Sequence, residues 1–189
     1  MATAARAGVF VVAAAIGAFD LGSYFYLRWH SVDFVVARRV ADAPAYALGT
    51  KVSWIEQSPG ALFGWARPGP EGTWSTAPAA ALIVRLPAPP TGDLVLVAEV
   101  IPFIDAQKLP ERHVEVLVNQ TPVAQWGFDR RRIAERVARI PREVVSGDGV
   151  VRIDFRFPDL RSPLELGIGE DWRKIALQLV VWRLEAAAP

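Results

Sequence analysis

The sequence contains no cysteine, so it forms no disulfide and offers neither a thiolate nucleophile nor a zinc–thiolate site. Histidine is also scarce, since only His30 and His113 are present, and neither stands in a catalytic motif. No glycine-rich phosphate loop, histidine cluster with metal spacing or calcium loop occurs in the chain. We therefore nominate no catalytic residue, no metal ligand and no cofactor.

An excess of charge of one sign is absent as well. The 21 Lys and Arg residues nearly balance the 20 Asp and Glu residues, which leaves a net charge of +1. Without a general positive field, nucleic acid is not an expected partner. The 189 residues are 52% hydrophobic, which suffices for one well-buried domain and an additional segment. These features favour a binding or assembly protein over an enzyme.

What is present begins with an apolar run from Ala7 to Leu27, interrupted only by Asp20 and Ser23. A helix of about 20 such residues spans the hydrocarbon layer of a bilayer, which is about 30 Å thick. Aromatic residues between Tyr24 and Trp29 follow, where an interfacial belt would lie. Residues 1–30 therefore predict an N-terminal transmembrane anchor.

The alternative for this segment is a signal peptide that is cleaved near Ala18. Arginine far outnumbers lysine in the chain, as is typical of GC-rich bacterial genomes. We expect a single-pass protein of the bacterial inner membrane with its folded domain in the periplasm. Sidedness stays open, because Arg28, Arg38 and Arg39 on the C-terminal flank favour a cytoplasmic domain by the positive-inside rule.

One face of the predicted membrane helix carries Ala13, Gly17, Asp20 and Tyr24, at 100° per residue. An aspartate near the middle of a span costs about 2.5 to 3.5 kcal/mol on translocon scales, and small neighbours let a second helix approach it. The face predicts contact with a membrane protein partner. The alternative is that Asp20 lies near an interface or in a removed signal peptide.

Beyond a juxtamembrane linker at residues 31–47, the pattern from Leu48 onward is that of half-buried antiparallel strands, in which apolar and polar residues alternate. Residues 48–189 therefore predict a mainly β fold with antiparallel strands, either a sandwich or a barrel. The turn Asn119-Gln120-Thr121-Pro122 predicts a tight hairpin. The strands are expected at Ala80–Leu86, Asp93–Ile104, Arg112–Asn119, Val150–Phe157 and Lys174–Leu184.

One short helix is expected within the sandwich, at Asp129–Pro141, where Ile133, Val137 and Ile140 have helical spacing. The arginines of this segment are interpreted as a solvated helix face. The alternation also predicts the core: Val114, Val116, Val118, Ile153, Phe155, Phe157, Leu177 and Leu179.

Three stretches together resemble a known family: "GWARPGPEGTWSTAPAAALIVRLP", "HVEVLVNQTPVAQWGF" and "IDFRFPDLRSPLELGIGEDWRKIALQLVVWRLE". Over Gly64 to Glu185 the chain is similar to the jelly-roll-like β-sandwich domain of unknown function found in bacterial membrane and envelope proteins, often attached to membrane glycosyltransferases. The resemblance implies that residues 48–189 form an exported antiparallel β-sandwich of jelly-roll-like form with glycan contact, and it brings no agreed catalytic residues. This chain departs from it by having Gln120 at the usual hairpin glycine and by carrying no glycosyltransferase.

Tryptophans are the main candidates for binding, since an indole stacks on a sugar face or anchors a protein partner. Trp126 and Trp182 lie within predicted strands, where core packing is expected. Trp65, Trp74 and Trp172 have Gly, Pro and charged neighbours, which leaves binding and packing equally open. The nominated binding residues are Trp65, Trp74, Trp172, Glu71 and Asp171.

One further pair in the last loop is Asp171 with Arg173, which we expect to form a structural ion pair at the entrance to the closing strand. Leu164, Leu166 and Ile168 alternate in the same loop and are expected to pin it to the core.

From these observations we expect a non-enzymatic single-pass membrane subunit whose β-sandwich assembles or stabilises a larger membrane protein complex. The alternative is a glycan-binding accessory protein of envelope polysaccharide synthesis.

Replacing Asp20 with leucine tests the predicted helix contact. The Asp20→Leu protein should still insert, because the helix becomes more hydrophobic, but it should lose its partner during gentle detergent purification from the native host. Full retention of every partner, or a mature chain that starts after Ala18, would show that assembly does not depend on this helix.

Overall fold

The computed structural model describes residues 45–53, 61–145 and 147–188, which belong to the unit Val40–Pro189. The predicted anchor and its contact face of Ala13, Gly17, Asp20 and Tyr24 lie outside the described residues and stay predictions. Within the described ranges, none of the helical structure is long and apolar enough to cross a membrane.

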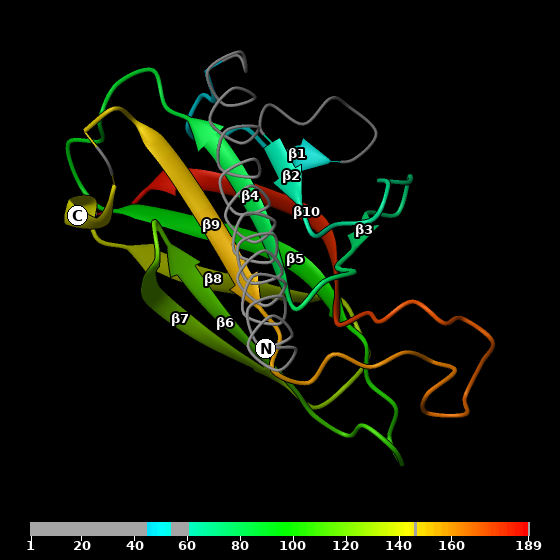
Figure 1. The fold of residues 1–189 in the computed structure, drawn as a ribbon. Helices are drawn as coiled ribbons and strands as arrows, with labels where there is room; N and C mark the ends of the chain where they lie inside the picture. The colour runs from blue at the N-terminus through cyan, green and yellow to red at the C-terminus, as the bar shows by residue number, and fades with distance from the viewer. Residues whose placement is uncertain (1–44, 54–60, 146, 189) are drawn as a thin grey trace, which may run out of the picture. The chain divides into compact units, whose positions relative to one another are not determined.

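The described residues form ten strands and one helical turn (Figure 1). The elements are β1 (Val52–Ser53), β2 (Ala61–Phe63), β3 (Thr73–Trp74), β4 (Ala79–Arg85), β5 (Leu94–Pro102), β6 (Arg112–Val118), β7 (Thr121–Phe128), β8 (Ala134–Ile140), the 3-10 turn η1 (Arg142–Val144), β9 (Val150–Arg156) and β10 (Leu177–Ala186).

Two antiparallel sheets contain these strands. The first sheet has the order β1-β10-β5-β8, with β3 also paired to β10. The second has the order β2-β4-β9-β6-β7. Apolar side chains from both sheets form one buried cluster between them, so the described unit is an antiparallel β-sandwich, as the sequence predicts.

The predicted core is confirmed, because all eight nominated side chains are buried. Strand β6 shows the reason: Val114, Val116 and Val118 point into the sandwich, while His113 and Glu115, at the alternate positions, face outward. Trp126 and Trp182 are also buried, at 4% and 1% exposure. Tyr46, two residues before the predicted start of the sandwich, stacks on Trp182 with ring centroids 5.3 Å apart.

The predicted helix at Asp129–Pro141 is wrong, because most of this segment is strand β8. Val137 shows the error, since it is 52% exposed although it belongs to the supposed helical apolar face. The buried side chains are instead Ala138 and Ile140, which have a spacing of two. Seven residues of β8 pair with β5, so tertiary pairing outweighs a helical spacing that rested on three residues.

The hairpin between β6 and β7 is present as predicted, with Asn119 and Gln120 as its two turn residues. Both have positive φ, 46° and 73°, which is the conformation of a type I′ turn. Two residues beyond the turn the register shifts by one: Leu117 lies opposite Pro122, but Val116 lies opposite Ala124. The extra residue in β7 is a β-bulge, which reverses the faces of all residues that follow it.

The loops divide between the two ends of the sandwich. Strand β5 ends opposite the start of β10, β6 begins opposite the end of β7, and β9 ends opposite the start of β4. The β5–β6, β7–β8 and β9–β10 connections therefore share one end, which we call the loop end. The described chain enters at the other end, where the Tyr46 amide donates to the carbonyl of Arg85, the last residue of β4.

Replacing Gln120 with glycine should stabilise the protein. A non-glycine residue at φ 73° pays a left-handed backbone cost that glycine avoids, so the free energy of unfolding should rise by about 0.5 to 1 kcal/mol after glycine's larger loss of chain entropy. Denaturant melts of Gln120→Gly would measure the change, with Thr121→Gly in β7 as the destabilising control. A loss of stability in Gln120→Gly would contradict the assigned turn.

Candidate ligand-binding site

A row of polar side chains crosses the outer face of the second sheet. Glu115 of β6 lies directly opposite Gln125 of β7 and opposite Arg156 of β9. Alternation places all three outside, because Val114, Trp126 and the other inward residues of these strands fill the core. Three neighbouring strands thus present a carboxylate, an amide and a guanidinium in line.

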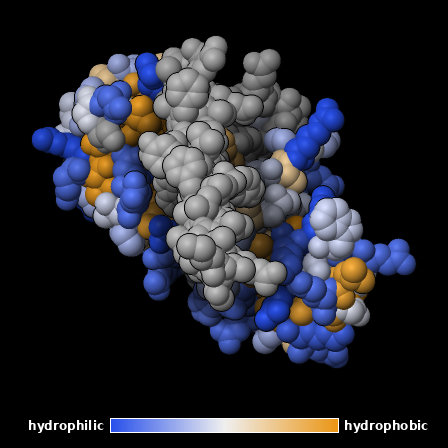
Figure 2. All heavy atoms as spheres, viewed as in Figure 1, coloured by the Kyte–Doolittle hydropathy of each residue, from blue (hydrophilic) through white to orange (hydrophobic). Residues whose placement is uncertain are grey.

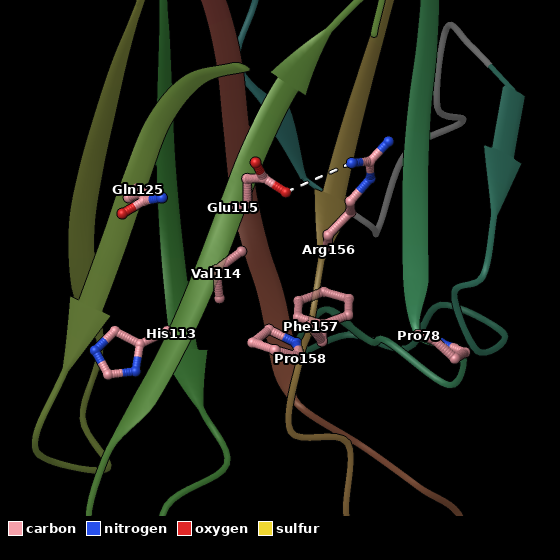
Figure 3. Close-up of a pocket in the computed structure, with 8 residues that line it drawn as sticks. All are labelled: Pro78, His113, Val114, Glu115, Gln125, Arg156, Phe157 and Pro158. Atoms are coloured by element: carbon pink, nitrogen blue, oxygen red, sulfur yellow. Dashed lines mark ion pairs between the residues drawn. The ribbon is translucent and has the colours of Figure 1, made fainter. Parts of the chain in front are cut away.

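A hollow of about 560 Å³ lies along this row (Figure 3). His113 borders it on β6, two residues before Glu115, so the imidazole and the carboxylate share the outer face. The remaining lining is apolar. It comes from Pro78, Val114, Phe157 and Pro158.

Gly127 explains why the sheet surface is open beside His113. The two residues are cross-strand partners, so a side chain at position 127 would stand next to the imidazole. A Cβ placed on Gly127 meets no atom within 4 Å. The missing side chain therefore leaves space in line with the hollow.

The two opposite charges in the hollow, on Arg156 and Glu115, form an ion pair but no hydrogen bond with each other. Arg156 Nη1 and Glu115 Oε2 lie 3.6 Å apart, and Figure 3 shows the two side chains directed toward one another. The distance is that of an ion pair and exceeds the length of a hydrogen bond. The Arg156 guanidinium therefore keeps donors, and the Glu115 carboxylate keeps acceptors, for a ligand or for water.

The β9–β10 connection, residues 157–176, is ordered by its own polar contacts at the loop end. The Ser162 hydroxyl accepts from the amide of Glu165, and the Glu165 carboxylate accepts from the amide of Ser162, both at 3.0 Å. The Glu165 carboxylate also pairs with Lys174 Nζ at 2.9 Å. Lys174 and the Ser162 amide hold the pKa of Glu165 below its usual value.

The predicted ion pair of Asp171 with Arg173 is confirmed. The guanidinium donates Nη2 to Asp171 Oδ2 at 2.6 Å and Nε to Oδ1 at 3.0 Å, and the amide of Arg173 donates to Oδ1 at 2.9 Å. These donors, the guanidinium first, lower the pKa of Asp171 to about 2. Asp171 therefore fixes the local loop backbone.

Arg112, the first residue of β6, ties this loop to the sandwich. Its side chain is buried, with Nη1 donating to the Asp159 carbonyl and Nη2 donating to the Phe103 carbonyl. Burial lowers the pKa of Arg112 to about 10, against the opposing charge of Asp159. The guanidinium stays charged at neutral pH and joins the β5–β6 and β9–β10 connections.

The nominated binding residues differ in how far their side chains are packed or exposed. Trp65 is half-buried, donates Nε1 to the Ala81 carbonyl at 3.1 Å and packs edge-on against Phe155. Its contacts are therefore those of a packing residue. Trp74 lies in β3, where its carbonyl accepts from the amide of Ala66 at 2.7 Å.

Glu71 has an exposed side chain, and its carbonyl accepts from Gln178 Nε2 at 3.0 Å. Trp172 and Asp171 lie in the β9–β10 connection, where Trp172 is 76% exposed. Of the three nominated tryptophans, Trp172 alone has a largely exposed indole.

The binding residues predicted from the sequence include none of the residues that line the hollow. His113 and Glu115 carry an available signal, because alternation places them on the solvent face of a strand. Gln125 and Arg156 join them only through the register of three strands, and one of those registers contains a bulge. Within the described ranges, no group of three His, Asp or Glu side chains is arranged to hold a metal ion.

Comparison with known proteins gives structural likeness only. No protein-family model and no curated protein matches the sequence. Among solved structures, the CBM36-1 domain of a multidomain xylanase from the hindgut metagenome of Trinervitermes trinervoides has a TM-score of 0.43 and 10% identity, over 74% of this chain and 98% of that domain.

A carbohydrate-binding module CBM36, solved with calcium and xylotriose, has a TM-score of 0.42 and 11% identity, over 72% of this chain and 99% of the module. A family 35 carbohydrate-binding module from Clostridium thermocellum has a TM-score of 0.42 and 10% identity, over 74% of this chain and all of the module, 100%. Similarity at this level does not define the function of this chain. The membrane and glycosyltransferase context implied by the family resemblance is not shown by these neighbours.

The low pKa of Asp171 predicts an acid-sensitive loop. Because the pKa is depressed in the folded state, the contribution of this carboxylate is complete above the unfolded value of about 3.8 and is lost as the pH falls through about 2. Nuclear magnetic resonance titration should place the pKa of Asp171 near 2, with faster amide exchange at Arg173 below it. A pKa near 3.8 would refute the assigned pair, and Arg173→Gln, which removes the guanidinium, is the control in which the pKa of Asp171 should rise.

Proposed function

We propose that this protein is a non-catalytic glycan-binding module and that the hollow on its second sheet holds the ligand. The main support for this proposal is the row formed by Glu115, Gln125 and Arg156, with His113 beside it, on three adjacent strands. A sugar presents several hydroxyl groups, each both a donor and an acceptor of hydrogen bonds. A carboxylate, an amide, an imidazole and a guanidinium together provide complementary groups.

The apolar parts of the hollow support the same proposal. Pyranose rings carry C–H surfaces as well as hydroxyl groups, so a sugar site combines a few directed polar groups with apolar walls. The exposed rings of Pro78 and Pro158 supply such walls at the loop end of the row, next to the buried Phe157. The polar groups of the row lie on regular strands, which fixes their spacing before a ligand arrives.

Binding rather than hydrolysis follows from the acid groups of the hollow. Hydrolysis of a glycosidic bond commonly needs two carboxyl groups on opposite sides of the bond. The residues that line the hollow include one, Glu115, which is paired with Arg156. The lining therefore suits recognition of hydroxyl groups rather than acid–base chemistry.

The ligand is best sought with the full chain in mild detergent on an array of bacterial and plant polysaccharides, followed by calorimetry on the bound glycan. Arg156→Gln should weaken binding by about 10- to 100-fold, the effect of losing one charged hydrogen-bond donor. Stability should change little, because the Arg156–Glu115 pair is exposed and worth at most about 1 kcal/mol.

Arg139→Gln is the matched control, since Arg139 also forms an exposed ion pair, with Asp93, but lies on the other sheet. Gly127→Leu should block the site by filling the open space, whereas Gly92→Leu, which also meets no atom within 4 Å, should bind normally. The proposal fails if no glycan binds the wild-type chain, or if Arg156→Gln and Gly127→Leu bind as well as their controls.

A further inference from the structure

The β9–β10 connection exposes three large hydrophobic side chains. Leu164, Ile168 and Trp172 are 56%, 40% and 76% exposed, so the prediction that Leu164 and Ile168 pin the loop to the core is wrong. Backbone hydrogen bonds of 3.0 Å join Leu164 to Asp171, the neighbour of Trp172, and Ile168 to Pro163, the neighbour of Leu164. We call this group of three the loop cluster.

The loop cluster is held outward by an ordered scaffold. The reciprocal Ser162–Glu165 bonds and the Glu165–Lys174 pair fix one side of the loop. From the β5–β6 connection, Lys108 Nζ donates to the Leu166 carbonyl. Because these contacts fix the backbone, the hydrophobic side chains cannot turn inward without breaking them. Figure 1 shows this loop projecting beyond the strands, and Figure 2 shows hydrophobic atoms among hydrophilic ones in that lobe.

The size of the loop cluster argues against a second protein as its main occupant. A stable protein interface buries about 800 Å² on each partner. An aromatic side chain buries about 150 to 250 Å², and one tryptophan with two partly exposed aliphatic residues stays well below that requirement. Insertion into a bilayer requires no minimum buried area, because each apolar side chain that enters the bilayer contributes its own free energy of transfer from water. Tryptophan with aliphatic neighbours is suited to the boundary between headgroups and acyl chains.

The charges around the loop cluster are balanced, so we expect its contact with a membrane to depend on hydrophobic side chains and not on electrostatic attraction. The β9–β10 connection, together with Lys108 that reaches it from the β5–β6 connection, carries four cations and four carboxylates, so their formal charges cancel. Two of the carboxylates are paired within the loop. This balance predicts little dependence on anionic lipid or on salt. The charged groups are Lys108, Arg161, Arg173, Lys174, Asp159, Glu165, Glu170 and Asp171.

The predicted anchor would keep the sandwich beside a bilayer and raise the effective concentration of the loop cluster there. The cluster lies at the end opposite Tyr46, so the chain between Leu27 and Tyr46 must allow for the length of the sandwich. Its 18 residues, 28–45, reach at most about 60 Å when extended. The ten residues of β10 span only about 33 Å. We propose that the loop cluster inserts into the interfacial region of a lipid bilayer.

The absence of cysteine permits a site-specific test in the full chain. Ile168→Cys would carry an environment-sensitive fluorophore, and Gln120→Cys at the opposite end of the sandwich is the matched control. Both proteins are reconstituted into phosphatidylcholine vesicles, with and without phosphatidylglycerol. A probe at position 168 should shift to the blue and be quenched by lipids spin-labelled near the headgroups, in both vesicle types and at high salt. The probe at position 120 should do neither.

Trp172→Ser and Leu164→Ser, placed in the Ile168→Cys background, should abolish the quenching while leaving the melting temperature unchanged. The proposal is overturned if position 168 stays as water-exposed as position 120, if the serine changes have no effect, or if salt removes the signal. A blue shift without vesicles that grows with protein concentration would assign the loop cluster to a second copy instead. Loss of glycan binding in Arg156→Gln leaves these results unaffected, so the two proposals fail separately.

Discussion

The bulge between β6 and β7 determines which side chains form the core and which form the candidate site. After the register shift, Trp126 points inward, where its ring contacts Phe155 and its Nε1 donates to the Val137 carbonyl at 3.1 Å. Gln125 consequently points outward, into the row with Glu115 and Arg156. Without the extra residue, the alternation would expose the indole and bury the amide. One backbone irregularity thus serves both stability and the polar surface of the sheet.

A second constraint acts at the loop end through the buried guanidinium of Arg112. Placing this charge in the interior is costly, as its lowered pKa indicates, and two backbone carbonyls offset part of the cost. Those carbonyls belong to Phe103 and Asp159, so the bonds fix the starts of both the β5–β6 and β9–β10 connections. Phe157 and Pro158, which line the hollow, lie immediately before Asp159. The position of one buried side chain is therefore coupled to both surfaces assigned a binding role.

The sequence predicts the fold well where a pattern is local. Alternation identifies the buried valines of β6, and the Asn119-Gln120 pair identifies the turn although glycine is missing. It fails for β8, because three apolar residues at helical spacing carry less energy than seven residues of pairing with β5. The candidate site is harder still, since its row depends on cross-strand register. Counting outward from the hairpin would place Ala124, and not Gln125, opposite Glu115.

The exposed hydrophobic residues of the β9–β10 connection also show that a local sequence pattern does not determine which side chains are buried. An alternating Leu164, Leu166 and Ile168 has the appearance of a strand face, yet two of the three point into solvent. Their orientation depends on contacts that no local pattern contains, such as the donation from Lys108 across the loop end. Polar contacts within the loop satisfy hydrogen-bonding groups of its backbone, so the loop stays ordered while its hydrophobic side chains face the solvent. The polar scaffold therefore makes it possible for the loop to present hydrophobic groups to a second phase.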